Sequence, residues 1–157
     1  MKTLNGIKKS LIVCILATSC INGLSFANTT QASAEVSSQI FDKVKQNNNW
    51  KLAFLTAKDA QIVFMNIFPS TNPNNEIGME THKFDQIIFI VEGNGKAILD
   101  GKTTMVKSGD MIFIPQGIEH NVKNSNAKKP LKILSVYTST DIPANSAFKK
   151  KSDVPQD

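Results

Sequence analysis

The 157-residue chain contains no arginine, so all 18 of its basic residues are lysines. Specific recognition of bases and phosphates relies on the flat, forked guanidinium group of arginine, and its absence argues against a nucleic-acid-binding protein. The formal charge of +5 includes Lys2, Lys8 and Lys9, which lie in an N-terminal segment without acidic residues. Removal of that segment leaves a charge of +2, which gives no reason to expect an electrostatic partner.

Cysteine is also scarce, because Cys14 and Cys20 are the only two and both lie near the N-terminus. Cleavage of the chain after Ala27 leaves a mature protein without cysteine. Such a protein has no disulfides, no thiolate zinc site and no cysteine nucleophile, and its hydrophobic core must supply its stability.

Long apolar runs are missing as well. The N-terminal run at 11–17 is shorter than the roughly 20 residues that a membrane-spanning helix needs. Lysines precede this run and Ser25-Phe26-Ala27 follows it, which is the three-part pattern of a signal peptide. We therefore predict that residues 1–27 direct export to the periplasm or the medium. Ala32-Ser33-Ala34 is a second candidate cleavage site, and a retained N-terminal helix or a lipid on Cys20, which would anchor the chain to a membrane, are the alternatives.

Glycine and proline number only 8 and 6, and they cluster between short apolar runs, as in an all-β protein. We expect residues 28–50 to form a polar leader and a short amphipathic helix within 35–46. Residues 51–138 would form the β domain. Residues 139–157 would be a polar tail whose run of three lysines at 149–151 lies in solvent.

Eight strands are expected in this β domain. Asp100-Gly101 separates two of them, and this dipeptide is a strong signal for a tight hairpin because both positions tolerate positive φ. A count of about eight short strands with regular turns predicts a sandwich or barrel. The expected strands are 52–55, 61–68, 86–91, 96–99, 102–106, 111–114, 121–124 and 131–137.

The chain has two histidines, His82 and His120, and each lies near other potential ligands. Glu80, His82 and Gln86 all have even numbers, so along a strand their side chains would face the same side. Phe84, Ile88 and Ile90 share that parity, which predicts a polar cluster at one end of an apolar interior.

The spacing around His120 is the more specific pattern. Gly109, Pro115, Gly117, His120 and Asn124 occupy every position of the second sequence motif of the cupin family, and the chain resembles a small, type-2-like cupin over roughly 51–138. The resemblance implies a double-stranded β-helix, that is, a jelly-roll barrel, with the short helix added at its N-terminus. It also implies that dimerisation through an outer sheet is plausible, since cupins often form homodimers.

The first cupin motif is matched at Glu80, His82, Gln86 and Gly93, with changes. Glu80 replaces a histidine, Gln86 replaces a glutamate, and an upstream glycine is absent. In the family the corresponding side chains bind a divalent metal. The resemblance therefore implies a site at Glu80, His82, Gln86 and His120 for Mn, Fe, Ni, Co or Zn, with Gln86 either a ligand or a residue that orients water.

Fold and site do not identify a reaction. We expect either a metal-dependent enzyme that acts on a small organic molecule, of dioxygenase or isomerase type, or a non-catalytic protein that binds a small sugar or acid. A metal-free pocket is the alternative to the metal site, because small barrels also hold ligands without metal. Neither reading involves a nucleic acid, and a membrane would be involved only if Cys20 carried a lipid.

Overall fold

A computed structural model describes residues 34–155. The predicted signal peptide at 1–27, with Cys14 and Cys20, lies outside these residues. Among the residues described, no helix combines the length and the apolar character needed to cross a membrane.

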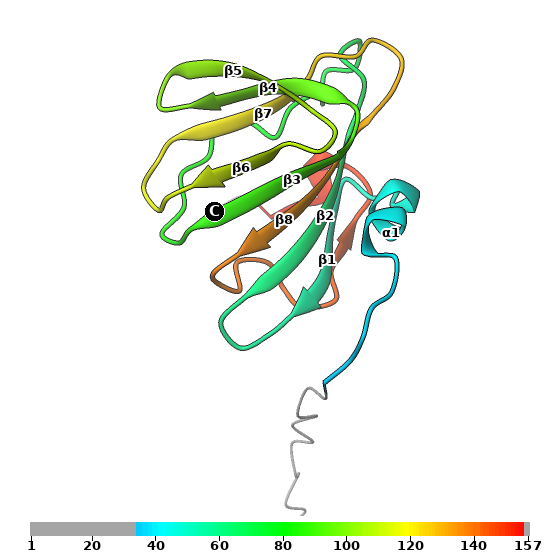
Figure 1. Ribbon diagram of the computed structural model, residues 1–157, viewed down its shortest axis with the longest axis vertical. Coiled ribbons are helices and arrows are strands. Elements are labelled where there is room, and N and C mark those ends of the chain that lie inside the picture. The colour runs from blue at the N-terminus through cyan, green and yellow to red at the C-terminus, as the bar shows by residue number, and fades with distance from the viewer. Residues whose placement is uncertain (1–33, 156–157) are drawn as a thin grey trace, which may run out of the picture. The chain divides into compact units, whose positions relative to one another are not determined.

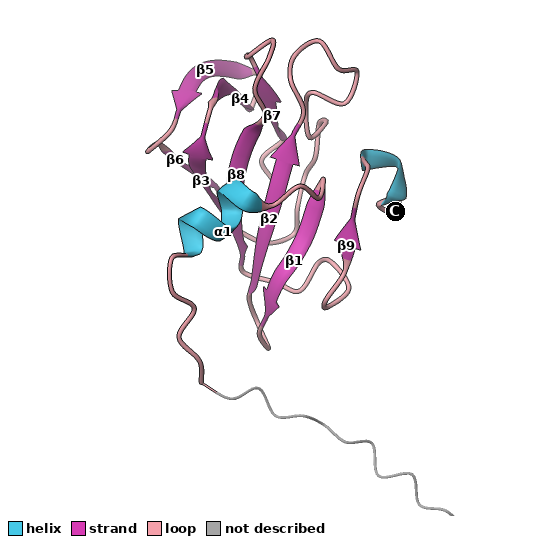
Figure 2. Cartoon of the chain, turned by 90° about the vertical axis from the view of Figure 1, so that its right-hand side faces the viewer, coloured by secondary structure: helices cyan, strands magenta, loops and turns pink. Residues whose placement is uncertain are grey.

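The described chain forms two antiparallel sheets and one short α-helix (Figures 1 and 2). The larger sheet has the strand order β6-β3-β8-β2-β1-β9, and the smaller sheet has the order β5-β4-β7. The elements are α1 Ile40–Gln46, β1 Lys51–Thr56, β2 Gln61–Ile67, β3 Gln86–Glu92, β4 Asn94–Leu99, β5 Lys102–Lys107, β6 Met111–Ile114, β7 His120–Asn124, β8 Leu131–Tyr137, β9 Ala147–Phe148 and the 3-10 turn η1 Lys151–Asp153.

Alternation along the strands divides the apolar residues between two faces of the larger sheet. On β2, Val63, Met65 and Ile67 point inward and join residues from both sheets in the main core. Phe64 points outward and packs with Val44 of α1. Because the period is two, one strand can supply the interior and the surface under the helix at the same time. This arrangement confirms the all-β, jelly-roll class predicted from the sequence.

Turn chemistry explains why the strand ends lie near their predicted positions. Asp100 and Gly101 adopt φ values of 47° and 74°, and β4 pairs with β5 on either side of them. Gly93 has a φ of 97°, and a Cβ there would lie 2.9 Å from the Pro130 carbonyl oxygen. Only glycine fits this close approach, which separates β3 from β4.

The helix is shorter than its apolar pattern indicates. The pattern begins at 35, whereas α1 begins at Ile40, after Gln39 with its positive φ of 53°. Val36 remains 93% exposed, and most of the other described residues before α1, at 34–39, are exposed as well. Val44 is fully buried and holds the helix against the outer face of the larger sheet.

Part of the segment expected as a polar tail is integrated into the fold. β9 pairs with β1, with Phe148 opposite Lys51. Gln61 on β2 holds the segment before β9 in place at Ile142. Its Nε2 donates to the Ile142 carbonyl oxygen (2.7 Å) and its Oε1 accepts from the Ile142 amide (3.1 Å). Gln61 and Ile142 are both buried, so these bonds form out of contact with bulk water.

Candidate metal centre

Backbone pairing brings the two predicted motifs together. The amide of Glu80 donates to the His120 carbonyl oxygen and the amide of His120 donates to the Glu80 carbonyl oxygen, each at 2.9 Å. Glu80 and His82 therefore lie in the loop before β3, and they do not share one strand with Gln86 as the parity argument assumed. The side chains converge through this bridge between segments and not through alternation along one strand.

A turn after β6 forms further hydrogen bonds to the loop that carries Glu80 and His82. The Gly117 amide donates to the His82 carbonyl oxygen (2.8 Å), and the Gln116 amide donates to Asp85 Oδ1 (2.9 Å). Gly117 has a φ of 82°, which glycine adopts without strain. The Pro-x-Gly spacing thus fixes the loop that carries His82 as well as the start of β7 at His120.

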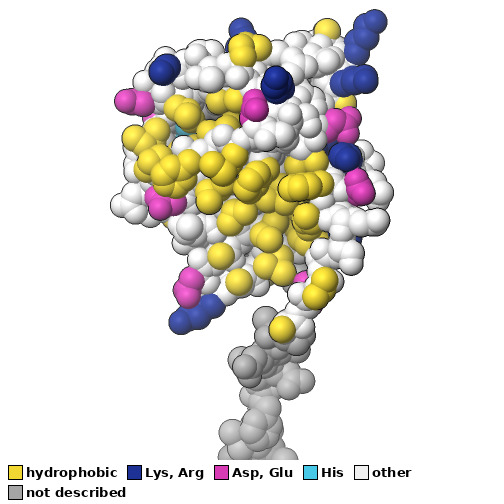
Figure 3. Space-filling view, in the orientation of Figure 1, with side chains coloured by type: hydrophobic (Ala, Val, Ile, Leu, Met, Phe, Trp, Pro, Cys, Tyr) yellow, Lys and Arg dark blue, Asp and Glu magenta, His cyan; other side chains and the backbone are white. Residues whose placement is uncertain are grey.

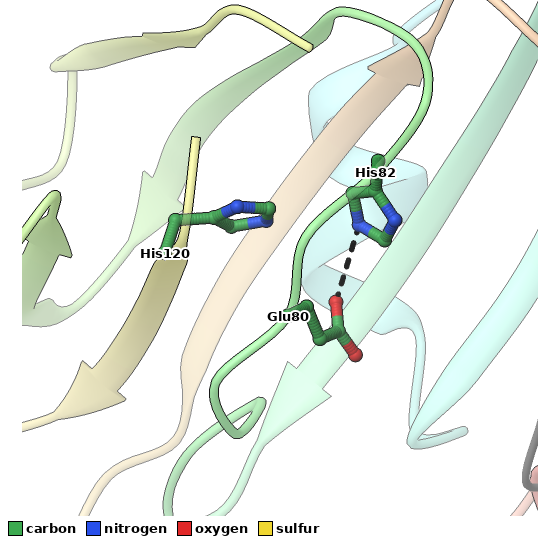
Figure 4. Close-up of side chains that lie close together, drawn as sticks. All are labelled: Glu80, His82 and His120. Atoms are coloured by element: carbon green, nitrogen blue, oxygen red, sulfur yellow. Dashed lines mark ion pairs between the residues drawn. The ribbon is translucent and has the colours of Figure 1, made fainter. Parts of the chain in front are cut away.

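Glu80, His82 and His120 each direct one donor atom into a common space, and these atoms lie within 4.8 Å of one another (Figure 4). His82 Nε2 is 3.4 Å from Glu80 Oε2, which is close enough for attraction but long for a hydrogen bond. His82 Nε2 and His120 Nε2 are both buried, and neither has a hydrogen-bond partner in the described chain. Buried nitrogens without partners are costly unless something else satisfies them.

The orientation of His120 suits a metal ligand. Its Nδ1 lies 2.9 Å from the Ile118 carbonyl oxygen, which can only accept, so Nδ1 carries the hydrogen and Nε2 keeps its lone pair. Burial lowers the pKa of His120, and the nearby His82 lowers it further, which favours the neutral imidazole that binds metal.

Glu80 supplies the negative charge. Burial alone would raise the pKa of Glu80, but interaction with His82 and the positive charge of Lys51 outweigh burial, and the pKa lies below the ordinary glutamate value. The carboxylate is therefore ionised at neutral pH. Two imidazoles and one carboxylate are sufficient to hold a first-row transition metal with open positions, so the residues present fit such an ion.

Gln86 lies at the start of β3, where it is paired with Tyr137 on β8. Its Nε2 donates to Ser135 Oγ (3.2 Å), and its Oε1 is buried without a hydrogen-bond partner in the described chain. The ring of Tyr137 is 5.7 Å from that of His82. The amide oxygen of Gln86 is thus a third buried polar atom without a hydrogen bond, at the start of the strand that follows the loop with Glu80 and His82.

Aromatic rings surround His82. Phe84 stacks on it with centroids 4.6 Å apart, and Tyr137 lies 5.1 Å from Phe84. Burial raises the pKa of Tyr137 well above its usual value, so its phenol stays protonated and adds no charge. These rings exclude water from one side of the site, which strengthens electrostatic interactions there.

A cavity of about 610 Å³ opens beside Glu80 and His82. Sequence reasoning missed two residues that line it: Lys51 was not considered, and Lys151 was assigned to a solvated run. A signal was present for Lys51, because it shares strand parity with the inward-facing Ala53, and a lysine on an apolar strand face is unusual. Lys151 had no such signal.

The comparisons with known proteins agree with this architecture. The profile of the family described as "Cupin domain" matches residues 70–137. A crystal structure of BH2720 from Bacillus halodurans superposes with a TM-score of 0.71 at 27% identity, and the match covers 76% of this chain and 92% of that one. Protein NMB1881 from Neisseria meningitidis superposes with a TM-score of 0.52 at 17% identity over 66% of this chain and 98% of that one, which is a likeness of fold alone.

A curated relative, the uncharacterized protein MJ1618 of Methanocaldococcus jannaschii, is 42% identical over 50 residues. This match spans 32% of the present chain and 39% of the relative's length. The names of these three proteins assign no reaction.

The lowered pKa of Glu80 predicts a pH effect on stability. A carboxylate whose folded-state pKa is depressed stabilises the fold above its ordinary pKa, and this contribution is lost as the pH falls through the folded value. In chelator-treated protein, Glu80→Gln should therefore flatten the acid side of the curve of unfolding free energy against pH, measured by urea unfolding. Asp59→Asn, at an exposed position, is the control and should follow the wild type. Parallel curves for wild type and Glu80→Gln would contradict the assignment.

Proposed function

Since residues 70–137 form a small cupin domain, we propose that this protein binds one divalent transition metal through Glu80, His82 and His120, with Gln86 as a weaker fourth ligand or a water-orienting group. The observation that carries the proposal is the pair of buried imidazole nitrogens, His82 Nε2 and His120 Nε2, which form no hydrogen bond in the described chain and lie beside an ionised carboxylate. The donor set favours Mn, Fe, Co, Ni or Zn without selecting one of them.

The best-supported activity is metal-dependent chemistry on a small organic molecule held in the adjoining cavity. A bound metal would act as a Lewis acid toward an oxygen of the ligand. Glu80 and His82 line the cavity, so a ligand there would lie next to the donor atoms. His120 is held in one orientation by its bond to the Ile118 carbonyl oxygen, and Phe84 and Tyr137 limit water. A dioxygenase or isomerase is the type of enzyme that we favour.

A non-catalytic binding protein is the second candidate. Among the described residues no nucleophile–base pair accompanies the metal donors, which is what a pure binding site would show. Conversion of substrates by Fe(II)- or Mn(II)-loaded protein in air would support an enzyme. Ligand binding without conversion, unaffected by a chelator, would support the binding protein.

Metal content after reconstitution tests the site directly. By plasma mass spectrometry we expect about one metal per wild-type chain, and loss of stoichiometric metal from His82→Ala and from His120→Ala, since imidazole is the main ligand. Glu80→Ala should lose nearly as much, because it removes the anionic ligand. Gln86→Ala should have the smallest effect, because a neutral amide oxygen is a weak donor.

Glu119→Ala, at the exposed residue beside His120, is a matched control and should keep its metal. Circular dichroism would establish that each variant remains folded. Wild-type metal content in a double His82→Ala, His120→Ala variant would exclude the metal site and leave the metal-free pocket.

We also propose that the protein is exported and loses residues 1–27. The support is the order of lysines, apolar run and Ser25-Phe26-Ala27 in the sequence. Terminal sequencing of the protein from its native host should find Asn28 at the N-terminus, and a retained Met1 in the soluble fraction would contradict export by cleavage.

A homodimer is the assembly that the surface favours. Hydrophobic side chains form a broad band on the face shown in Figure 3. On β6, Met111 and Phe113 are 58% and 52% exposed, whereas the alternating Ile112 and Ile114 are buried. Exposed apolar patches of this kind mark association surfaces.

If a second copy covers this face, Phe113→Glu should convert a dimer to a monomer, because it would bury an unpaired carboxylate. Light scattering after size exclusion provides the measurement. Met105→Glu places the same charge at a 60% exposed methionine on β5 in the other sheet and should leave the dimer intact. A monomeric wild type at high protein concentration would refute the dimer.

A further inference from the structure

Lys51 is a largely buried lysine whose ammonium has no direct hydrogen bond or ion pair in the described chain. It is the first residue of β1 and only 8% exposed. Within residues 34–155 its ammonium forms neither a hydrogen bond nor an ion pair. Burial of a charged group costs free energy unless the group is paired. The Lys51 ammonium is therefore a group that a ligand in contact with it could pair.

Lys132 shows how this protein satisfies a buried lysine by itself. Lys132 is 4% exposed, and its ammonium donates to the Asn47 carbonyl oxygen. The negative charge of Glu92 also acts on it. The Lys51 ammonium, by contrast, has no hydrogen-bond acceptor within residues 34–155 and lines an open cavity, so it remains available to a ligand there.

The position of Lys51 indicates where that acceptor would bind. Lys51 lines the 610 Å³ cavity that also contains Glu80 and His82, and it is paired across the sheet with Met65, another lining residue. Its positive charge acts on Glu80, although the two side chains form no ion pair. A ligand in this cavity would lie between the metal donors and a lysine.

A second lysine borders the same space. Lys151 Nζ donates to the Glu76 carbonyl oxygen (3.2 Å) and lies 5.9 Å from the centre of the Trp50 ring. An ammonium has three donors, so Lys151 keeps donors for a ligand. Trp50 and the buried Ile142 supply apolar walls. The cavity therefore combines an apolar body with a cationic wall.

The cavity is lined by two lysines, Lys51 and Lys151, and by two carboxylates, so a metal on Glu80 would turn its charge balance toward an anion. Asp141 also lines it, but this residue is exposed, so solvent screens its charge more than that of the buried Lys51. A divalent metal on Glu80 would add further positive charge. The chain has no arginine, which disfavours strongly anionic ligands such as sugar phosphates and leaves a carboxylate, with its single negative charge, as the anion that a lysine point charge can balance.

We propose that the cavity binds an organic carboxylate, with its carboxylate on Lys51, supported by Lys151, and its apolar body against Trp50 and Ile142. This inference rests on the proposed function, because it places the ligand's other end next to the metal donors. The competing explanation is that Lys51 only balances the charge of Glu80, in which case its removal would alter metal binding and leave ligand affinity unchanged.

The test uses phenylacetate and its neutral amide, phenylacetamide, as matched probes in calorimetric titrations of the full chain, loaded with Mn(II) and after chelation. The wild type should bind the acid more tightly than the amide. Lys51→Met removes the charge and keeps the length of the side chain. It should raise the Kd of phenylacetate at least about tenfold, as expected for a lost charged hydrogen bond, and change that of phenylacetamide less than about twofold.

Lys151→Met should weaken phenylacetate binding less, because Lys151 is less buried, and it provides a second variant if Lys51→Met does not fold. Lys102→Met, at an exposed position of β5, is the control and should match the wild type. Metal content should be unchanged in all three variants.

The inference is overturned if phenylacetate does not bind to the wild type at millimolar concentration, if acid and amide bind equally, or if Lys51→Met leaves the acid's Kd unchanged. It is also overturned if Lys51→Met alters metal content instead of acid affinity. Failure of the metal proposal has a different signature: a wild type without metal that still binds phenylacetate through Lys51 would keep the carboxylate site and remove the metal.

Discussion

The reciprocal backbone hydrogen bonds between Glu80 and His120 are the constraint on which the site depends. They join the loop before β3 to the first residue of β7, which lies in the smaller sheet. Backbone bonds hold position without using side-chain atoms, so the carboxylate and both imidazoles stay available. The hydrogen bond from the Gly117 amide to the His82 carbonyl oxygen adds a third point of attachment. Together these three bonds fix the loop before β3 although it is not part of a strand.

Around these backbone hydrogen bonds several polar side-chain atoms are buried, although apolar atoms at the same positions would cost less free energy to bury. Asn124, at the far end of β7, shows the usual solution: its amide donates to the carbonyl oxygens of Ile67, Phe68 and Lys129. The atoms at the site differ, because His82, His120 and Gln86 each have a buried atom without a hydrogen bond in the described chain. Unpaired polar atoms that gather in one place are what a binding site requires before its ligand arrives.

Much of the fold could be predicted from the sequence because turn residues are local. Asp100-Gly101 and Gly93 marked strand ends to within a few residues, and alternation marked the inner faces. The positions of His82 and His120 followed from motif spacing. Strand parity did not explain how Glu80 joins them, because the link is a pairing between distant segments. β9 and the packing of Ile142 were not foreseen, since they depend on Gln61, which lies 81 residues earlier.

Trp50 is the only tryptophan of the chain, and it is almost fully buried in the wall of the cavity. Its ring lies beneath the Lys151 ammonium and beside Phe68, with centroids 5.8 Å apart. Tryptophan emission from this protein therefore comes from a single, defined location. The molecule carries its own optical reporter at the meeting point of β1, the C-terminal turn and the cavity, so events in that space can be followed in solution without an attached dye.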